Sequence, residues 1–259
     1  MEIQPILIPF FSILLFMHGM FILAIALKNN SIVDVGWGLG FIIATYFAYL
    51  TIPASHSFNL LFAMVGLWGV RLATYIFLRN WGKGEDFRYR QWREEWGQNV
   101  IFRSYLQVFL LQGAIMFIVC MPILLFGLEV KKGTIPENLS IIQYVGFSIW
   151  GLGFAIESLA DLQLYLFKKK EKNKGQIMKF GLWKYSRHPN YFGESLVWWG
   201  IYLFVCSFGL AGISLFSPIL MTYLLRKVSG VVLLEKKYAT NQIYQEYVKN
   251  TPAFVPFWK

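Results

Sequence analysis

The chain has 259 residues, of which 56% are hydrophobic and 15% are charged, and its formal net charge is +10. A soluble protein usually carries about 25% charged residues. Here long runs of Phe, Leu, Ile and Trp replace that charge, and the mean hydropathy is +0.49. These values argue against a soluble protein. Nucleic-acid binding is not expected either, because the aromatic residues lie in the apolar runs and not among the basic residues.

Seven apolar runs approach the roughly 20 residues that a helix needs to cross a bilayer. They are residues 6–27, 32–50, 60–78, 106–125, 141–167, 191–208 and 210–225. The sequence therefore predicts an all-α polytopic membrane protein with about seven transmembrane helices in contact with the lipid bilayer. No repeat or low-complexity linker divides the chain, so one membrane domain over residues 1–259 is expected. The cysteines, Cys120 and Cys206, both lie in apolar runs, and no spacing predicts a metal site.

The basic residues predict how these helices are oriented. Nearly all of the 24 Lys and Arg residues follow the first, third and fifth runs or lie in the C-terminal tail. The opposite loops hold only Lys131 and Lys132. Because cytoplasmic loops are enriched in Lys and Arg, the N-terminus is expected outside and the C-terminus in the cytoplasm.

Ionisable residues within spans are costly and indicate function. Asp34 opens the second run and Arg71 lies in the third. Glu157 and Asp161 in the fifth run are four residues apart and share a helix face, and Lys168 follows two turns later. This stripe would suit a nicotinamide dinucleotide, with its amide and ribose donors at the acids and its phosphates at the lysines. The alternative is intramembrane pairing of Arg71 with Asp34 or with one of the two acids.

A second cluster precedes the sixth run, in the segment from Gly181 to Glu194. Pro189 disfavours helix at the residue before it, and Asn190 is the expected N-cap of the following helix. A helix start of this kind favours phosphate. Beside that start the segment has three possible donors to an anion, Lys184, Arg187 and His188. One turn beyond Asn190 it has a carboxylate, Glu194.

Several motifs together resemble one known family. They are Val33–Gly38, Trp68–Arg71, Arg79–Asp86, Tyr185–Glu194, Leu234–Lys237 and Thr251–Pro256. On these residues most of the chain resembles the steroid 5-alpha-reductase superfamily, in its bacterial branch of membrane proteins known as domain of unknown function 1295. The resemblance implies seven helices that hold NADPH in a cavity open to the cytoplasm. It also implies a monomer in the bacterial inner membrane that reduces a carbon–carbon double bond of a hydrophobic lipid or steroid-like enone.

The resemblance also assigns residues. The cofactor-binding half is expected at residues 140–259, with the cofactor at Glu157, Asp161, Lys168, Asn190, Glu194 and Arg226. Lys179 is the expected substitute for a family arginine that is Gln176 here. The family's catalytic Glu corresponds to Asp34, whereas its catalytic Tyr falls on Trp68, and Arg71 joins this candidate catalytic group. An indole N–H cannot deliver a proton as a phenol does, so the proton donor stays open between Tyr75, His18 and a water held by Asp34.

Two other functions are compatible with parts of the pattern. A membrane methyltransferase of the isoprenylcysteine or phospholipid type shares the Arg-His-Pro-x-Tyr motif but uses S-adenosylmethionine. Such enzymes typically show two adjacent Glu in the tail, and here Glu235 is followed by Lys236. The third alternative is a non-enzymatic lipid-binding or transport protein, which would not explain why donors suited to phosphate cluster before the sixth run.

Overall fold

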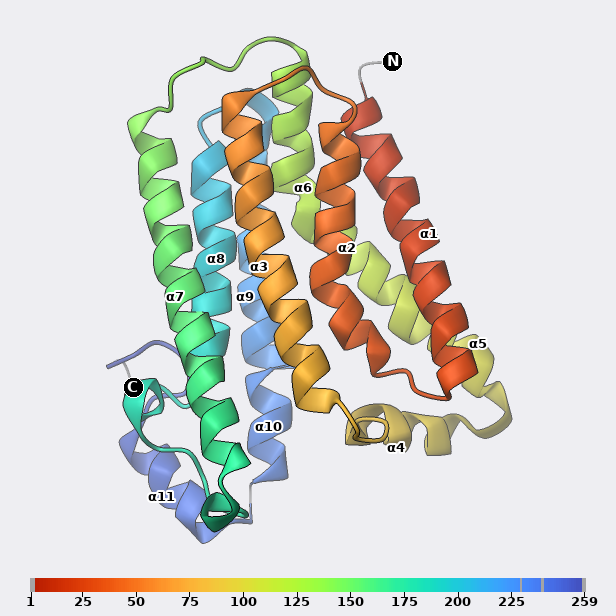
Figure 1. The fold of residues 1–259 in the computed structure, drawn as a ribbon, viewed down its shortest axis with the longest axis vertical. Helices are drawn as coiled ribbons and strands as arrows, with labels where there is room; N and C mark the ends of the chain where they lie inside the picture. The colour runs from red at the N-terminus through yellow and green to blue at the C-terminus, as the bar shows by residue number, and fades with distance from the viewer. Residues whose placement is uncertain (1–2, 229, 239, 258–259) are drawn as a thin grey trace. The chain divides into compact units, whose positions relative to one another are not determined.

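A computed structural model describes residues 3–228, 230–238 and 240–257. Within these residues the secondary structure is helical and no strand occurs, which confirms the all-α prediction (Figure 1). The chain forms two compact units. The first comprises Met1–Leu139 with Val205–Ser214, and the second comprises Ser140–Phe204 with Leu215–Lys259.

The first unit is built on three long helices and a fourth helical stretch. Its elements are α1 (Gln4–Leu27), α2 (Ile32–Tyr49), α3 (His56–Asn80), α4 (Phe87–Trp96), η1 (Gly97–Asn99), α5 (Val100–Ser104), the π-helix η2 (Tyr105–Leu110) and α6 (Leu111–Lys131). Helix α2 is central to the unit, because it contacts α1, α3 and α6. Helix α4 lies between the third and fourth predicted spans, where the apolar runs predict no helix.

Two glycines set the close approach of α2 and α3. A Cβ atom on Gly38 would lie under 3.0 Å from the backbone of Gly69, and the reverse also holds. Small residues let helix backbones approach in this way in membrane proteins. The approach brings Phe41 of α2 edge-on to Trp68 of α3, with ring centroids 5.6 Å apart. Both side chains are fully buried in the core of this unit.

The second unit contains one long helix, one medium helix and several shorter ones. Its elements are α7 (Ile141–Lys169), η3 (Glu171–Asn173), η4 (Gly181–Lys184), α8 (Pro189–Val205), α9 (Phe216–Tyr223), η6 (Leu224–Val228), α10 (Val231–Lys237) and α11 (Gln242–Asn250). The remaining helix, η5 (Gly209–Leu215), belongs to the first unit up to Ser214. Helix α7 begins with a capping box, in which Ser140 and Gln143 satisfy each other's backbone N–H groups.

A seam of glycines joins α7 to α8. Gly146 and Gly153 of α7 face Gly200 and Gly193 of α8, and a Cβ atom on any of the four would lie under 3.0 Å from backbone of the opposite helix. The two backbones are therefore in direct contact along several turns. This contact fixes the register of the polar residues that α7 and α8 carry.

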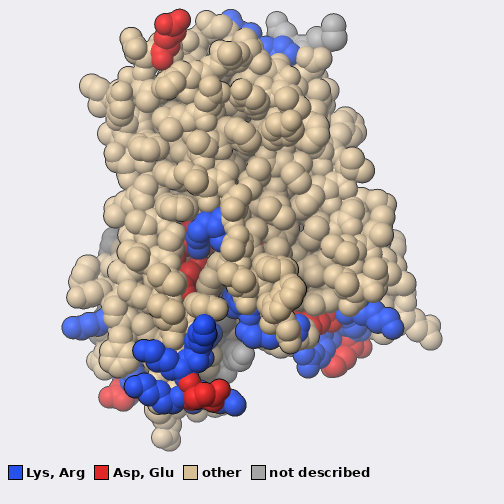
Figure 2. Space-filling model, in the orientation of Figure 1, with Lys and Arg blue, Asp and Glu red and all other residues tan. Residues whose placement is uncertain are grey.

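Six helical stretches of the described residues are long and apolar enough to cross a membrane. They are Gln4–Leu27, Ile32–Tyr49, His56–Asn80, Phe87–Lys131, Ile141–Lys169 and Gly209–Leu233. On the face that Figure 2 shows, most of the surface is free of charge, and Lys, Arg, Asp and Glu gather mainly at its top and bottom, apart from one small charged group near the middle. The chain is thus an integral, multi-pass membrane protein. The remaining predicted span corresponds to α8, whose 17 residues rise about 26 Å, slightly less than a bilayer core of about 30 Å.

Candidate functional site

Buried acidic residues of α7 lie beside the start of α8. Glu157 is 1% exposed and Asp161 is 3% exposed. Nδ2 of Asn190 donates a hydrogen bond to Oδ1 of Asp161 over 3.2 Å. The other carboxamide atom, Oδ1 of Asn190, is buried and has no hydrogen-bond partner within the residues that the structure describes. The site therefore has a buried, unsatisfied acceptor next to buried carboxylates.

The glycine seam positions these groups. Gly193 lies directly against the backbone of Glu157, which places the first turn of α8 beside the polar turns of α7. Glu194 follows Asn190 by four residues, so both project from one face of α8, and Glu194 is 7% exposed. The structure thus brings Glu157, Asp161, Asn190 and Glu194 onto the packed faces of the same two helices.

The expected N-cap role of Asn190 is wrong. Helix α8 already begins at Pro189, a residue that suits the first helical position because it has no N–H to leave unsatisfied. Asn190 lies inside the first turn, and its carboxamide turns to Asp161 instead of capping the backbone. The turn before the helix is held by Ser186, whose Oγ accepts from the backbone N–H of His188 over 3.1 Å.

Arg187 contacts the C-terminal part of the chain. Its Nε and Nη2 atoms donate to Oε1 of Glu235 over 2.9 and 2.7 Å. Its Nη1 atom donates to the backbone oxygens of Val248 and Thr251. All three guanidinium nitrogens are therefore engaged within the chain. The expected phosphate contact of Arg187 stays a prediction, whereas its role in holding the tail is what the structure shows.

His188 shares the same carboxylate. Its Nε2 atom lies 3.4 Å from Oε1 of Glu235, and its ring stacks on Tyr191 with centroids 5.7 Å apart. Burial lowers the pKa of His188, and Glu235 opposes this only in part. Burial would raise the pKa of Glu235, but hydrogen bonds from His188 and Arg187 bring it below its usual value. His188 is thus a mostly neutral ring at pH 7, and its expected phosphate contact also stays a prediction.

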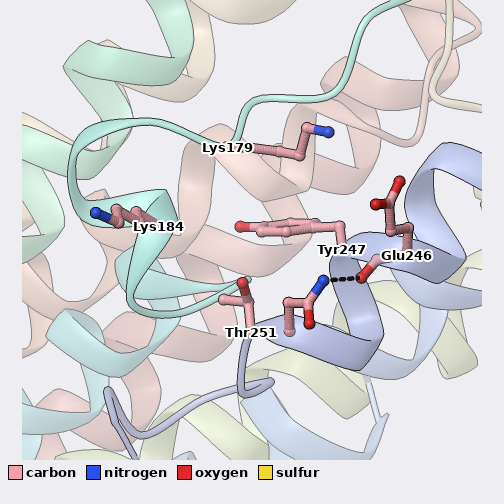
Figure 3. A pocket seen from close by; sticks show the side chains of 6 residues that line it. Lys179, Lys184, Glu246, Tyr247 and Thr251 are labelled. Atoms are coloured by element: carbon pink, nitrogen blue, oxygen red, sulfur yellow. Dashed lines mark hydrogen bonds between the residues drawn. The ribbon is translucent and has the colours of Figure 1, made fainter.

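Two of the predicted basic residues, Lys179 and Lys184, line one hollow of about 200 Å³, together with Glu246, Tyr247, Asn250 and Thr251. Figure 3 shows their ammonium groups pointing to opposite sides, with the ring of Tyr247 between them. The ammonium of Lys184 lies 5.8 Å from the ring centroid of Tyr185. The two lysines therefore share a wall of the hollow but do not converge on a single anion.

The two other predicted basic residues, Lys168 and Arg226, lie at helix ends. Lys168 is exposed in the last turn of α7. Arg226 in η6 is exposed as well, and its guanidinium lies 5.5 Å from the ring centroid of Phe254. Both side chains are accessible to a ligand that approaches the helix ends of this unit.

The candidate catalytic residues all belong to the first unit. Asp34 accepts a hydrogen bond from Nη2 of Arg88 over 2.8 Å and one from the hydroxyl of Tyr89 over 2.6 Å. Trp68 packs on Phe41, which lies seven residues, or about 10 Å along the axis, from Asp34. Arg71 is partly buried one turn beyond Trp68. Asp34 lies in the first turn of α2, whereas Trp68 of α3 packs about two turns further along α2, so the two side chains lie at different heights in this helix pair.

Sequence reasoning missed Tyr89 as a partner of Asp34. It belongs to α4, whose N-cap Asp86 accepts from the backbone N–H of Arg88 over 3.1 Å. A signal was present in the sequence. An Asp followed by aromatic residues at positions 89, 92 and 96 is typical of a capped amphipathic helix.

Comparison with known proteins assigns the chain to a family. A family model described as "Protein of unknown function (DUF1295)" matches residues 20–251. The chain belongs to the DUF1295 family. No curated protein and no solved structure gives a significant match.

The DUF1295 match covers most of both units and the predicted catalytic and cofactor residues from Asp34 to Arg226, whereas the candidate proton donor His18 lies outside it. No cluster of three or more His, Cys, Asp or Glu side chains suited to a metal ion occurs among the described residues.

Proposed function

We propose that this protein is a membrane-embedded, NADPH-dependent reductase of a carbon–carbon double bond in a hydrophobic lipid or steroid-like enone. The observation that carries the proposal is the Asn190–Asp161 pair, in which the carboxamide oxygen Oδ1 of Asn190 is buried and has no hydrogen-bond partner among the described residues. A buried acceptor without a partner costs about 1–3 kcal/mol. A ligand that donates an N–H or O–H there would recover that cost.

The chemistry of the neighbouring side chains suits the donor-rich parts of a dinucleotide. Carboxylates accept hydrogen bonds and do not donate them when ionised. Glu157, Asp161 and Glu194 therefore fit a carboxamide N–H₂ and ribose hydroxyls. The exposed Lys168 and Arg226 and the half-exposed Lys179 fit phosphates. We assign cofactor binding to residues 140–259 on this basis.

Bound NADPH would supply a hydride, and the chain's own residues would orient the substrate carbonyl. We keep Asp34, Trp68 and Arg71 as the candidate catalytic group, on the strength of the resemblance to steroid 5-alpha-reductases. Arg88 and Tyr89 support the assignment of Asp34, because both hold its carboxylate in one orientation. The phenol of Tyr89 joins the candidates for proton supply.

The proposal includes an orientation. In this proposal the protein lies in the inner membrane of a bacterium, with its C-terminus in the cytoplasm and its N-terminus outside, an orientation that the Lys and Arg content of the loops supports. NADPH is a cytoplasmic metabolite, so the basic helix ends of the second unit would face its supply. Seven spans, with α8 as the short one, agree with this orientation.

An S-adenosylmethionine-dependent methyltransferase is the second candidate. The buried carboxylates of α7 and α8 favour it to some degree, because they would also suit the ammonium group of that cofactor. Against it, Glu235 already accepts from Arg187 and lies 3.4 Å from Nε2 of His188 within the chain. The residue after it is Lys236, where methyltransferases of this type have a second acid.

A ligand-stabilisation experiment separates the two. The purified protein in detergent, heated with NADPH at about 100 times its dissociation constant, should gain about 2.7 kcal/mol. This corresponds to a rise of roughly 5 °C or more in Tm for a chain of this size. S-adenosylmethionine at the same concentration should give no rise. A rise with S-adenosylmethionine and none with NADPH would overturn the reductase proposal.

Matched variants test the site. Asn190→Ala and Glu157→Gln should each remove most of the NADPH-dependent rise. Asn59→Ala and Glu137→Gln make the same chemical changes at exposed positions and should keep it. If all four variants behave alike, the assignment of the cofactor to the α7–α8 acids is wrong.

A further inference from the structure

The first unit contains a separate pocket at the ends of α2 and α3. It has a volume of about 170 Å³ and is walled by the α1–α2 connection, the first turn of α2, the last turn of α3 and the turn that leads to α4. We call it the loop pocket. It is lined by Asn29, Ser31, Ile32, Val35, Phe77, Asn80, Trp81, Gly82, Lys83 and Gly84.

Three side chains offer hydrogen-bond donors to this pocket. Oδ1 of Asn29 accepts from the backbone N–H and hydroxyl of Ser31, and Oδ1 of Asn80 accepts from Nε of Arg79 over 3.2 Å. Both amide N–H₂ groups are then without a protein partner in the described residues. Lys83 donates one of its three protons to the backbone oxygen of Arg79. The polar part of the pocket therefore has N–H donors, on Asn29, Asn80 and Lys83, that remain available to a ligand.

The charge around the pocket is positive. Glu85 is paired with Arg93 over 2.9 Å, and Asp86 shares Arg88 with Asp34. Arg90 and Arg79 add positive charge beside these carboxylates. Lys83 forms no ion pair with a carboxylate of the described chain. Burial would raise the pKa of Glu85, but hydrogen bonds from Arg93 and from the backbone of Asn30 lower it. That carboxylate stays bound to its arginine, and Lys83 adds a positive charge to the pocket wall that no carboxylate of the described residues pairs with.

The other wall of the pocket is apolar and open. Phe77 is 46% exposed and Trp81 is 72% exposed, and their rings pack against each other at 4.9 Å. Val35 and Ile32 complete this wall. Exposed aromatic residues at the end of a membrane helix are typical of the interface between headgroups and acyl chains. The pocket thus joins an anion-binding end to a surface that suits hydrocarbon.

We propose that the loop pocket binds the phosphate-bearing headgroup of an anionic phospholipid from the leaflet that it faces. The phosphate would accept from Lys83, Asn29 and Asn80, and the proximal acyl chain would lie along Phe77 and Trp81. This site is independent of the proposed reductase function, because it uses none of its residues.

Lipid titration of the delipidated protein in detergent, followed by native mass spectrometry, tests the proposal. Dioleoyl phosphatidylglycerol should bind more tightly than dioleoyl phosphatidylcholine. Lys83→Gln should weaken phosphatidylglycerol binding roughly three- to ten-fold, the contribution expected of one lysine at an anionic surface. Asn80→Leu should weaken it in the same direction. Unchanged Tm values without added lipid would show that both variants fold.

Two controls make the result specific. Lys174→Gln and Asn59→Leu change exposed residues outside the pocket and should bind phosphatidylglycerol within two-fold of the unaltered protein. Inorganic phosphate in excess should not displace the lipid. Equal binding of the two lipids, or equal losses in Lys83→Gln and Lys174→Gln, would overturn the proposal. Full displacement by inorganic phosphate would also overturn it, because the pocket would then be a site for free phosphate.

Discussion

Arg187 and Glu235 form the contact that ties the segment before α8 to α10, with Nε and Nη2 of the arginine both on Oε1 of the glutamate. The same arginine donates to the backbone oxygens of Val248 and Thr251, so one side chain anchors both α10 and the C-terminal end of α11. Tyr247 supports this anchor, because its hydroxyl donates to the backbone oxygen of Trp183. The C-terminal segment is thereby fastened to the turn that precedes Asn190.

The first prediction concerns this anchor. Arg187→Lys should lower the free energy of unfolding by about 2–3 kcal/mol, because an ammonium cannot replace the planar guanidinium at three acceptors and leaves buried carbonyls unsatisfied. The measurement is Tm in detergent. Arg103→Lys, at an exposed position of α5, is the control and should leave Tm unchanged. A normal Tm in Arg187→Lys would show that the anchor contributes little.

The second prediction concerns the glycine seam. Gly193→Ala places a Cβ about 2.5 Å from the backbone nitrogen of Glu157, so α7 and α8 must separate, at a cost of at least about 1–3 kcal/mol. Gly151→Ala lies on α7 with open space around its Cβ, and should be neutral or stabilising by up to about 1 kcal/mol. Thermal unfolding of the two variants checks this. Equal effects would contradict the seam.

The third prediction concerns the loss of stability as the pH falls. Burial lowers the pKa of His188, so the unfolded chain binds more protons than the folded one as the pH falls below about 6.5. Above that pH, His188 makes its full contribution to the free energy of unfolding. This contribution is lost as the pH falls through the lowered pKa that His188 has in the folded chain. The lowered pKa of Glu235, set by burial against the hydrogen bonds of His188 and Arg187, adds a loss below about pH 4.3.

Tm measured between pH 7 and pH 5 should therefore fall, and His188→Gln should flatten that part of the profile. His56→Gln, at an exposed position, keeps His188 and should retain the slope. A profile of His188→Gln with the original slope between pH 7 and pH 5 would assign the acid sensitivity to other groups.

The fourth prediction concerns α4. Tyr89→Phe removes the hydroxyl that donates to Asp34 over 2.6 Å. The loss of a hydrogen bond to a charged acceptor should cost about 1.5–3 kcal/mol. Because α4 is then held less firmly, trypsin should cleave faster at the exposed Arg90. Tyr46→Phe, at a tyrosine that is 45% exposed, should leave both stability and cleavage unchanged; faster cleavage there as well would argue against a specific role of Tyr89.

The sequence by itself determined the helical membrane class and the approximate limits of the spans. Long apolar runs without charge have one stable solution in lipid, since each helix satisfies its own backbone groups. The first run, residues 6–27, accordingly falls within α1, and residues 141–167 fall within α7. Helix periodicity also placed Glu157 and Asp161 on one face, and both are buried.

Only the tertiary structure decided which polar groups meet. The partners of Asp34, Arg187 and Asn190 are 29 to 64 residues away in sequence, and no periodicity reports contacts over that separation. Asn190 looked like a cap because its local signal was read alone, whereas the glycine seam turns its carboxamide toward Asp161. Arg187 looked like a free donor because the Glu235 that engages it lies in another helix. Helices arise from local backbone bonding, but the pairing of their side chains depends on how the backbones pack.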